Sequence, residues 1–438
     1  MRATRQALRR AGPDQERGNP RLQRHSDGTQ RMTTLLFSIR PQATLESELA
    51  RLAALPPMLP FSAPLREFVA EFSRRVFALP QLREHPELAT LGHWFRGAAV
   101  NQLSQRLSAR SGELNLARGL VFHLAPANVD VLFAYAWLMS VLAGNTNVAR
   151  LSQKQSTQRD ALVSILHAMH AEGVHLQVLE RAVLLTYPHD DAVTGLISRH
   201  CHARIIWGGD ATVAKIRSLP IAPLAVELAF PDRFGVAVVR AAALATADAA
   251  ELQELARRFC NDVLWFGQQA CSSPRCLYWI GGAADIAAAK SRFWPAVRDQ
   301  AGQIDDEPAA LMARVTDANL LAALGHGVHS PDAMGLYPLR LETPRADGHL
   351  REIQSGHGLV VEIALADLAD LAAQLDDRDQ TLVQHGFSAQ DLTGFLSTLG
   401  NRAVDRVVPF GRALDFHPVW DGTDLLDVLT RKITLPAT

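Results

Sequence analysis

Short apolar segments alternate with helical segments between residues 119 and 239, and this alternation restricts the possible folds more than any other feature of the sequence. The apolar segments have the length and composition of strands that are covered on both faces. The segments between them carry the capping residues and terminal glycines of helices. This order predicts parallel β-α-β units, and therefore an α/β fold with a doubly wound parallel sheet.

The alternation gives each expected element a place. Strands are expected at residues 119–126, 146–152, 182–188, 203–209, 223–230 and 234–239, with helices at 129–143, 156–173, 190–200 and 210–219. Ligands of doubly wound sheets bind beyond the carboxyl ends of the strands, so the segments that follow three of these strands matter most. These segments are "APAN" at 125–128, "RLSQK" at 150–154 and "WGGD" at 207–210.

The length of the chain indicates two domains of ordinary size, because 438 residues are too many for one compact core. Residues 33–118 are predicted to be mainly helical from the three-to-four spacing of their apolar residues. After residue 240 we expect a second α/β region, with helices at 247–266, 284–302, 306–324, 368–375 and 391–400, strands at 275–280, 358–364 and 381–388, and an ordered tail at 406–435.

The composition excludes several classes of protein. A formal net charge of −1 gives no reason to expect nucleic acid or an anionic membrane as a partner. The best candidate for a membrane span, residues 129–144, is shorter than the ~18 apolar residues required and contains Asp130, so a buried core helix is expected. Four cysteines are too few for a disulfide framework in a chain of this length and indicate a reducing compartment, which we take to be the cytoplasm.

Residues 1–31 differ in composition from the rest of the chain. They contain eight arginines against three acidic residues, with no apolar period and no apolar core of a secretory signal. We expect a disordered N-terminal extension here, with an organelle presequence as the alternative. Met32 is a second candidate for the start of the protein, because the sequence that follows it is typical of ordered structure.

The segment "QQACSSPRCLYW" at 268–279 contains two of the four cysteines and admits three interpretations. Cys271 lies between small residues on an expected loop, where a thiolate and its own main-chain N–H would be accessible to a substrate. A metal site shared with Cys276 would need two further ligands, and the chain has no second cysteine pair of this kind. The third interpretation is a buried thiol without chemistry, which is what we expect of Cys201, Cys260 and Cys276.

The three segments at strand ends contain further candidates, each with a structural alternative. Asn128 is either a helix N-cap or an amide donor that faces the crevice of the sheet. Gly208 and Gly209 lie between a strand and a helix, where a main chain can approach a phosphate, although the chain has no GxGxxG fingerprint. Arg150 is either a solvated side chain or a contact to a ribose or its 2′-phosphate.

Taken in chain order, four segments resemble the LuxC-type acyl-CoA reductases, relatives of the fatty acid reductase subunit of bacterial bioluminescence and a branch of the aldehyde dehydrogenase superfamily. The segments are "HLAPANVDVLFAYAWLMSVLAGNTNVARLS", "ARIIWGGDATV", "WFGQQACSSPRCLYW" and "VPFGRALDFHPVWDGTDLLDVLTR". The similarity extends over about residues 100–435. "QQACSSP" and the closing "WDG" are specific to this family, whereas "AGNTNVAR" is shared with the wider superfamily.

The resemblance implies an aldehyde dehydrogenase-like division of the chain. Residues 32–235 would form a nicotinamide-cofactor-binding domain with N-terminal helices, and residues 236–410 a catalytic domain with the nucleophile loop. Residues 411–438 would form a C-terminal segment that packs back on both domains. The active site would lie between the two domains.

The resemblance also implies roles for single residues. Cys271 would be the catalytic nucleophile and Asn128 the amide that stabilises the oxyanion. Arg150 takes the place of a superfamily lysine that touches the adenosine ribose. Gly208 and Gly209 fall on a Gly-Ser turn near the cofactor's phosphates. Since glycine replaces that serine here, the main chain or Thr212 would supply the contact.

Glu227, in "VEL", resembles the general base of the superfamily. The glycine pair that follows this base is missing, and the separation from Cys271 in the sequence is longer than usual. We therefore assign Glu227 no role. Its loss is compatible with thioester reduction, because an enzyme of that kind does not need to activate water.

The activity implied by the resemblance is NADPH-dependent reduction of an acyl thioester, a fatty acyl-CoA or acyl-carrier, to the aldehyde through an acyl-enzyme on Cys271. NADH is the alternative reductant. Implied partners are an acyl-activating ligase or a carrier protein, and a homo-oligomer is expected. Two other functions stay in view: a cysteine-dependent thioesterase or acyltransferase, and a non-catalytic scaffold subunit of a fatty acid reductase complex.

Overall fold

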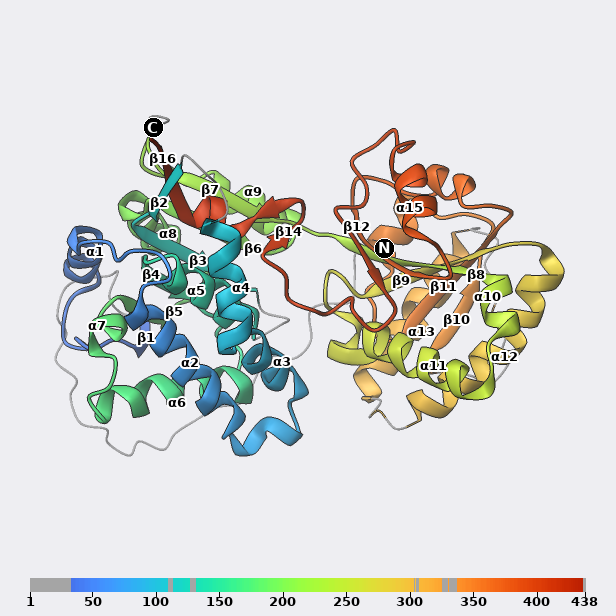
Figure 1. Cartoon of the computed structure of the whole chain (residues 1–438), viewed down its shortest axis with the longest axis horizontal. Coiled ribbons are helices and arrows are strands. Elements are labelled where there is room, and N and C mark those ends of the chain that lie inside the picture. Colours follow the sequence, from blue (N-terminus) through green and yellow to red (C-terminus); the bar gives the residue numbers. More distant parts are fainter. Residues whose placement is uncertain are drawn as a thin grey trace, which may run out of the picture. The chain divides into compact units, whose positions relative to one another are not determined.

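The first of two six-stranded sheets contains the strands expected between residues 119 and 230. A computed structural model describes residues 33–108, 113–126, 131–302, 304, 307–324, 330 and 337–435. The strand order is β1-β5-β4-β3-β6-β7 (Figure 1). The strands are β1 (Thr34–Phe37), β3 (Leu120–Leu124), β4 (Thr146–Arg150), β5 (Ala182–Thr186), β6 (Ala203–Trp207) and β7 (Val226–Phe230).

The winding of this sheet reverses at β3. All its strands are parallel except β1, which pairs antiparallel with β5 at one edge. The chain runs outward from β3 through β4 to β5, and then returns to place β6 and β7 on the other side of β3. The carboxyl ends of β3 and β6 therefore flank the switch point, where ligands of such sheets bind.

Helices cover both faces of this sheet, as the alternating apolar pattern predicted. Val121 of β3 packs into one core cluster, and its neighbour Phe122 packs into the other. The first face carries α2 (Ala63–Phe77), α3 (Pro86–Trp94), α4 (Gly97–Ser108), α5 (Leu132–Leu142) and α6 (Thr157–Ala171). The second carries α1 (Leu45–Ala54), α8 (Asp191–His200) and α9 (Asp210–Arg217). Every residue of α5 is buried, which makes it the core helix that the sequence predicted.

The second sheet is parallel throughout, in the order β10-β11-β9-β8-β12-β13 (Figure 1). Its strands are β8 (Phe234–Arg240), β9 (Pro274–Ile280), β10 (Leu339–Glu342), β11 (Leu359–Leu365), β12 (Asp379–His385) and β13 (Arg406–Pro409). One face is covered by α10 (Ala241–Thr246), α11 (Ala249–Leu264) and α12 (Ala283–Ala301), the other by α13 (Pro308–Ala323), α14 (Gly348–Ile353) and α15 (Ala389–Leu396).

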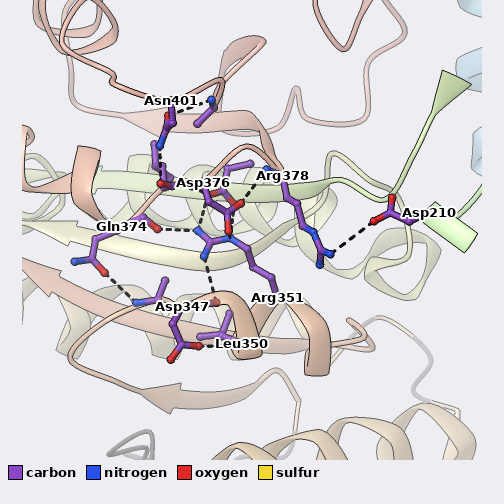
Figure 2. Close-up of polar contacts among 12 residues, drawn as sticks. Asp210, Asp347, Leu350, Arg351, Gln374, Asp376, Arg378 and Asn401 are labelled. Atoms are coloured by element: carbon purple, nitrogen blue, oxygen red, sulfur yellow. Dashed lines mark hydrogen bonds and ion pairs between the residues drawn. The ribbon is translucent and has the colours of Figure 1, made fainter. Parts of the chain in front are cut away.

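Arginine side chains tie the amino end of β12 to its surroundings. Arg351 of α14 lies beside Asp376 and donates to the carbonyl oxygen of Gln374 at 2.7 Å (Figure 2). Arg378, which directly precedes β12, extends to Asp210, the first residue of α9, with 3.6 Å between the charged atoms (Figure 2). The amino end of β12 in the second sheet thus contacts a helix of the first sheet.

The C-terminal segment returns to the core of the first sheet. It forms the hairpin β14 (Val419–Trp420) and β15 (Thr423–Asp424), then α16 (Leu425–Leu429), and finally β16 (Thr430–Thr434), which pairs with β2 (Glu113–Ala117). Leu425, Leu426 and Leu429 are buried in the cluster that surrounds α5. The "WDG" segment lies in the chain between β13 and these buried leucines of α16.

Several expectations need correction. Residues 33–118 are mainly helical, as predicted, but they also include the short strands β1 and β2, which were not predicted. The helix expected at 368–375 is a short 3-10 helix, η3 (Ala369–Ala373). Strand β10 was not predicted. Within the described ranges no helix is long and apolar enough to cross a membrane. The extension expected at 1–31 lies outside those ranges, and the division into functional domains stays a prediction.

Candidate active site

A cavity of about 600 Å³ lies where the strand ends of the first sheet meet the loop before β9. It is lined by Cys271, Arg150, Gly208, Gly209 and Thr212, which the sequence singled out separately. Asn128 falls in the segment 127–130, outside the described residues. Residues 125 and 126, just before it, line the same cavity. The structure thus brings five of the six predicted site residues to one place.

The buried amide of Gln268 holds the nucleophile loop in position. Its Nε2 donates to the carbonyl oxygens of Pro274 at 2.7 Å and Leu359 at 3.0 Å, and its Oε1 accepts from the N–H of Gly358 at 2.9 Å. These bonds fasten the loop to the amino ends of β9 and β11. Cys271 therefore lies on a loop that these hydrogen bonds hold in place. Packing and hydrogen bonds from the surrounding residues are what fix the position of a reactive group.

The backbone of the loop takes a sharp left-handed turn before it reaches Cys271. Phe266, Gly267 and Gln268 in η2 (Trp265–Gln268) have φ values of 55°, 56° and 62°. This conformation is uncommon for residues other than glycine and persists only where the surroundings enforce it. The turn ends α11 abruptly and directs the chain into the cavity.

Gly235 in β8 makes room for the same loop. A Cβ atom at this position would lie 2.5 Å from the carbonyl oxygen of Ser273 and 2.6 Å from that of Ser272. Distances this short are not tolerated between a carbon and main-chain oxygens, so the close approach of β8 to the loop requires a glycine here.

The thiol of Cys271 is protonated at neutral pH in this structure. Burial, followed by the nearby carboxylate of Asp421, raises its pKa to about 12. The indole N–H of Trp420, the guanidinium of Arg275 and the main-chain N–H of Cys271 itself act in the opposite direction. A group that removes the proton is therefore needed before the sulfur can act as a nucleophile.

The other three cysteines are buried, as the sequence predicted. Cys201, Cys260 and Cys276 have at most 2% of their surface exposed, and burial raises the pKa of each to about 12. All four cysteines are free thiols. Cys276 lies within β9, so it forms no disulfide with Cys271.

Arg150 is the last residue of β4 and lines the cavity at the carboxyl end of that strand, as the sequence predicted. Its Nη2 donates to the carbonyl oxygen of Tyr187 at 3.1 Å, and its guanidinium carbon lies 5.4 Å from the centre of the Tyr187 ring. Lys154 and His189 line the cavity nearby. Basic residues of the segments at the ends of β4 and β5 thus line part of the cavity.

The glycine pair after β6 permits close contacts with two side chains. A Cβ at Gly208 would lie 3.1 Å from the Thr212 methyl carbon, and one at Gly209 would lie 3.0 Å from a carboxylate oxygen of Asp232. Asp232 also accepts from the N–H of Asp210 at 3.2 Å, and its own N–H donates to the Asp210 carboxylate at 3.1 Å. These contacts bring the start of α9 against the end of β7 at the mouth of the crevice.

Glu227 is the second residue of β7 and is not among the residues that line the cavity. Its carboxylate accepts from Nε of the buried Arg204 at 2.7 Å and from Nε of Arg217 at 3.0 Å. Both oxygens are engaged in these ion pairs. Glu227 therefore supports the sheet and does not contribute to the cavity.

Sequence reasoning missed four further residues that line the cavity: Arg275, Trp420, Asp421 and Asp262. Trp420 and Asp421 belong to the "WDG" segment. This segment is far from Cys271 in the sequence, so its place in the site could not be predicted. Trp420 packs against Trp207 at the end of β6, with 5.8 Å between ring centroids. Asp262 accepts from the N–H groups of Gly411 at 2.6 Å and Ala413 at 2.8 Å, and so positions the approach to this segment.

The fold is that of the aldehyde dehydrogenases, as the sequence predicted. Aldehyde dehydrogenase 21 of Physcomitrella patens, solved with succinate, matches with a TM-score of 0.68 over 90% of each chain at 13% identity. PnpE in complex with nicotinamide adenine dinucleotide gives 0.62 over 90% of this chain and 88% of the other, also at 13% identity. Lactaldehyde dehydrogenase of Escherichia coli gives 0.58 over 89% and 85%, at 14% identity.

The model of the acyl-CoA reductase (LuxC) family matches residues 105–432. The chain belongs to this family of oxidoreductases, and the resemblance on which the sequence analysis rested is confirmed. The long-chain acyl-protein thioester reductase of Aliivibrio fischeri is 24% identical over 167 residues. This alignment covers 37% of the present chain and 32% of the relative, so the chain matches about a third of the length of this relative.

Proposed function

We propose that this protein reduces the acyl thioester of a fatty acyl-CoA or an acyl-carrier to the aldehyde, with NADPH as reductant and Cys271 as the nucleophile. The observation that supports this most is that Cys271 lines the same cavity as Arg150, Gly208 and Gly209 at the strand ends of the first sheet. A sulfur nucleophile and a dinucleotide-type crevice thus share one space. The relative named for an acyl-protein thioester makes a carrier protein a reasonable acyl donor.

In this proposal the Cys271 sulfur attacks the thioester carbonyl and forms a tetrahedral oxyanion. The main-chain N–H of Cys271 and the amide of Asn128 stabilise that oxyanion, and loss of one such donor typically costs about 10²–10³-fold in rate. The donor thiolate leaves, and the acyl group remains on Cys271. Trp420 and Arg275 favour the charged sulfur and so assist both its attack and its later departure.

The basic residues that line the cavity after β4 fit a phosphorylated dinucleotide. Arg150 and Lys154 place two cations there, and guanidinium groups bind phosphate with paired hydrogen bonds. Thr212 adds a hydroxyl at the start of α9. A bound nicotinamide supplies the hydride. The task of the chain is to hold the acyl carbonyl on Cys271 in the same cavity and to exclude water.

The position of Glu227 favours reduction over hydrolysis. In a hydrolytic pathway a base must activate water against the acyl-cysteine. Glu227 is held by Arg204 and Arg217 away from the cavity, so it does not serve as that base. The candidate base of the superfamily is therefore not placed to hydrolyse the acyl-cysteine.

The test is to incubate the purified protein with acyl-CoA, with and without NADPH. Aldehyde formed only with NADPH, and lost in Cys271→Ala but retained in Cys276→Ala, is the expected result. Free acid or transferred acyl group without NADPH would instead indicate a thioesterase or acyltransferase. A Cys271 that iodoacetamide does not label and that takes no acyl group would indicate a scaffold subunit.

A further inference from the structure

Asp421 is a buried carboxylate without an assigned function. Both its oxygens are buried and have no hydrogen-bond partner among the described residues, and its side chain lines the same cavity as Cys271. A buried carboxylate without hydrogen bonds is costly, and such groups in native structures call for an explanation.

The local backbone does not supply that explanation. Asp421 and Gly422 are the two residues that connect β14 to β15, with φ values of 46° and 71°. Asp-Gly is a preferred pair for a tight hairpin in which both central residues have positive φ. The turn accounts for the residue type and the conformation, but a turn aspartate needs no place inside a cavity.

The charges around Asp421 keep it able to exchange a proton. Burial raises its pKa to about 6, Arg233 acts to lower it, and Asp405 acts to raise it. Arg233 itself is engaged in an ion pair with Asp405. Besides Asp421, the thiol interacts with the positive charges of Arg275 and Arg406.

Other carboxylates of the cavity wall are already engaged. Among the described lining residues, Asp262 accepts two main-chain N–H bonds, Asp232 accepts one from Asp210, Asp415 pairs with Arg412, and Glu87 accepts from Gln158. Trp420 and Arg275, which also act on the sulfur, are donors and cannot take its proton. Of the carboxylates among the described lining residues, Asp421 is thus the one whose oxygens have no hydrogen-bond partner.

We propose that Asp421 is the proton acceptor for Cys271: its carboxylate takes the thiol proton, directly or through one water, and delivers it to the departing thiolate of the acyl donor. The S–H bond of Cys271 and the C–S bond of the donor break, while the acyl C–S bond to Cys271 and the S–H bond of the released thiol form. The proton balance is closed and Asp421 ends ionised. This role rests on the proposed function, since it concerns the acyl-transfer half of that reaction.

The test compares two reactions of Cys271 in Asp421→Asn. Acyl transfer from acyl-CoA, followed by intact mass without reductant, is expected to slow about 100-fold, within the range for loss of general acid–base catalysis. Alkylation by iodoacetamide at fixed pH is expected to become faster, because the carboxylate raises the pKa of the thiol. Asp421→Glu is expected to restore part of the acyl transfer. Asp367→Asn, in an exposed turn after β11, is the control and should change neither rate.

The outcomes separate this role from a structural one. Acyl transfer by Asp421→Asn at or above the wild-type rate would overturn the proposal, and so would a variant slowed in both reactions. Should the variant not fold, the wild-type pH profile decides: the acyl-transfer rate is expected to fall below about pH 6, where Asp421 protonates, and a flat profile there would overturn the role. A wild-type protein that is alkylated but takes no acyl group would contradict the proposed function itself.

Discussion

Glu227 accepts a hydrogen bond from the buried Arg204 at 2.7 Å, and this pairing places the superfamily's candidate base inside the sheet and outside the cavity. Arg204 is 2% exposed and also donates to the hydroxyl of Ser198 and the carbonyl oxygen of Leu219. A buried guanidinium with this many partners fixes the carboxylate in turn. Glu227 therefore stabilises the pairing of β6 with β7.

Glu227→Gln tests this assignment. Removal of one partner from a buried ion pair costs about 3–5 kcal/mol, so we expect the variant to unfold at a lower urea concentration. The folded fraction should still transfer an acyl group to Cys271 at within about threefold of the wild-type rate. Glu46→Gln, at an exposed position of α1, is the control for both measurements. A variant of normal stability with a rate reduced more than 100-fold would show that Glu227 acts in the chemistry.

Gly235→Ala tests how the nucleophile loop is held. The new Cβ would meet the carbonyl oxygens of Ser272 and Ser273 at about 2.6 and 2.5 Å, so β8 or the loop must move. We expect a loss of about 1–3 kcal/mol in stability and a change in the alkylation rate of Cys271. Gly97→Ala is the matched control, because nothing lies within 4 Å of the Cβ it would add. Equal behaviour of the two variants would contradict this account of Gly235.

Arg150→Gln tests the cofactor end of the cavity. If the guanidinium contacts the 2′-phosphate, loss of a charge-assisted hydrogen bond should raise the KM for NADPH about 10–100-fold. The KM for NADH should change by less than threefold. Arg66→Gln, on the exposed side of α2, controls for the loss of a positive charge. An equal rise in both KM values would place Arg150 at a part of the cofactor common to both.

Asp262 should make stability depend on pH. Burial raises its pKa to about 7, although the N–H groups of Gly411 and Ala413 act to lower it. A carboxyl group whose pKa is higher in the folded state stabilises that state fully when the pH is below the pKa of the unfolded state, which is near 4. This stabilisation is lost as the pH rises to about 7. The free energy of unfolding of the wild type should therefore fall, relative to that of Asp262→Asn, by up to about 4 kcal/mol as the pH rises over this range. Urea unfolding at pH 4, 5.5 and 7 measures it, and a constant difference would contradict the prediction.

The fold could be predicted best where apolar strand segments and helical segments alternate regularly along the sequence. Strands β3 to β7 and the buried helix α5 were predicted because apolar runs alternate with capped helices, a pattern set by local chemistry. Strands β1 and β2 were missed because each is a short edge strand whose partner lies far away in the chain, β5 for one and β16 for the other. Pairing over such separations leaves no local signal.

The site could be predicted only in part for the same reason. Cys271, Arg150 and the Gly208–Gly209 pair were found because each lies beside a strand or helix end. Asp421 escaped attention because an Asp-Gly pair is adequately explained as a turn, and only the fold shows that its carboxylate reaches the cavity. Gly235 was likewise inconspicuous within an apolar strand, since its importance comes from the main chain of Ser272 and Ser273.

The most direct test of the central claim is the intact mass of the protein after incubation with acyl-CoA in the absence of reductant. The account predicts one added acyl group, located on the peptide that contains Cys271, absent from Cys271→Ala, and discharged as aldehyde when NADPH is added. An unchanged mass, or an acyl group attached to a different residue, would contradict it.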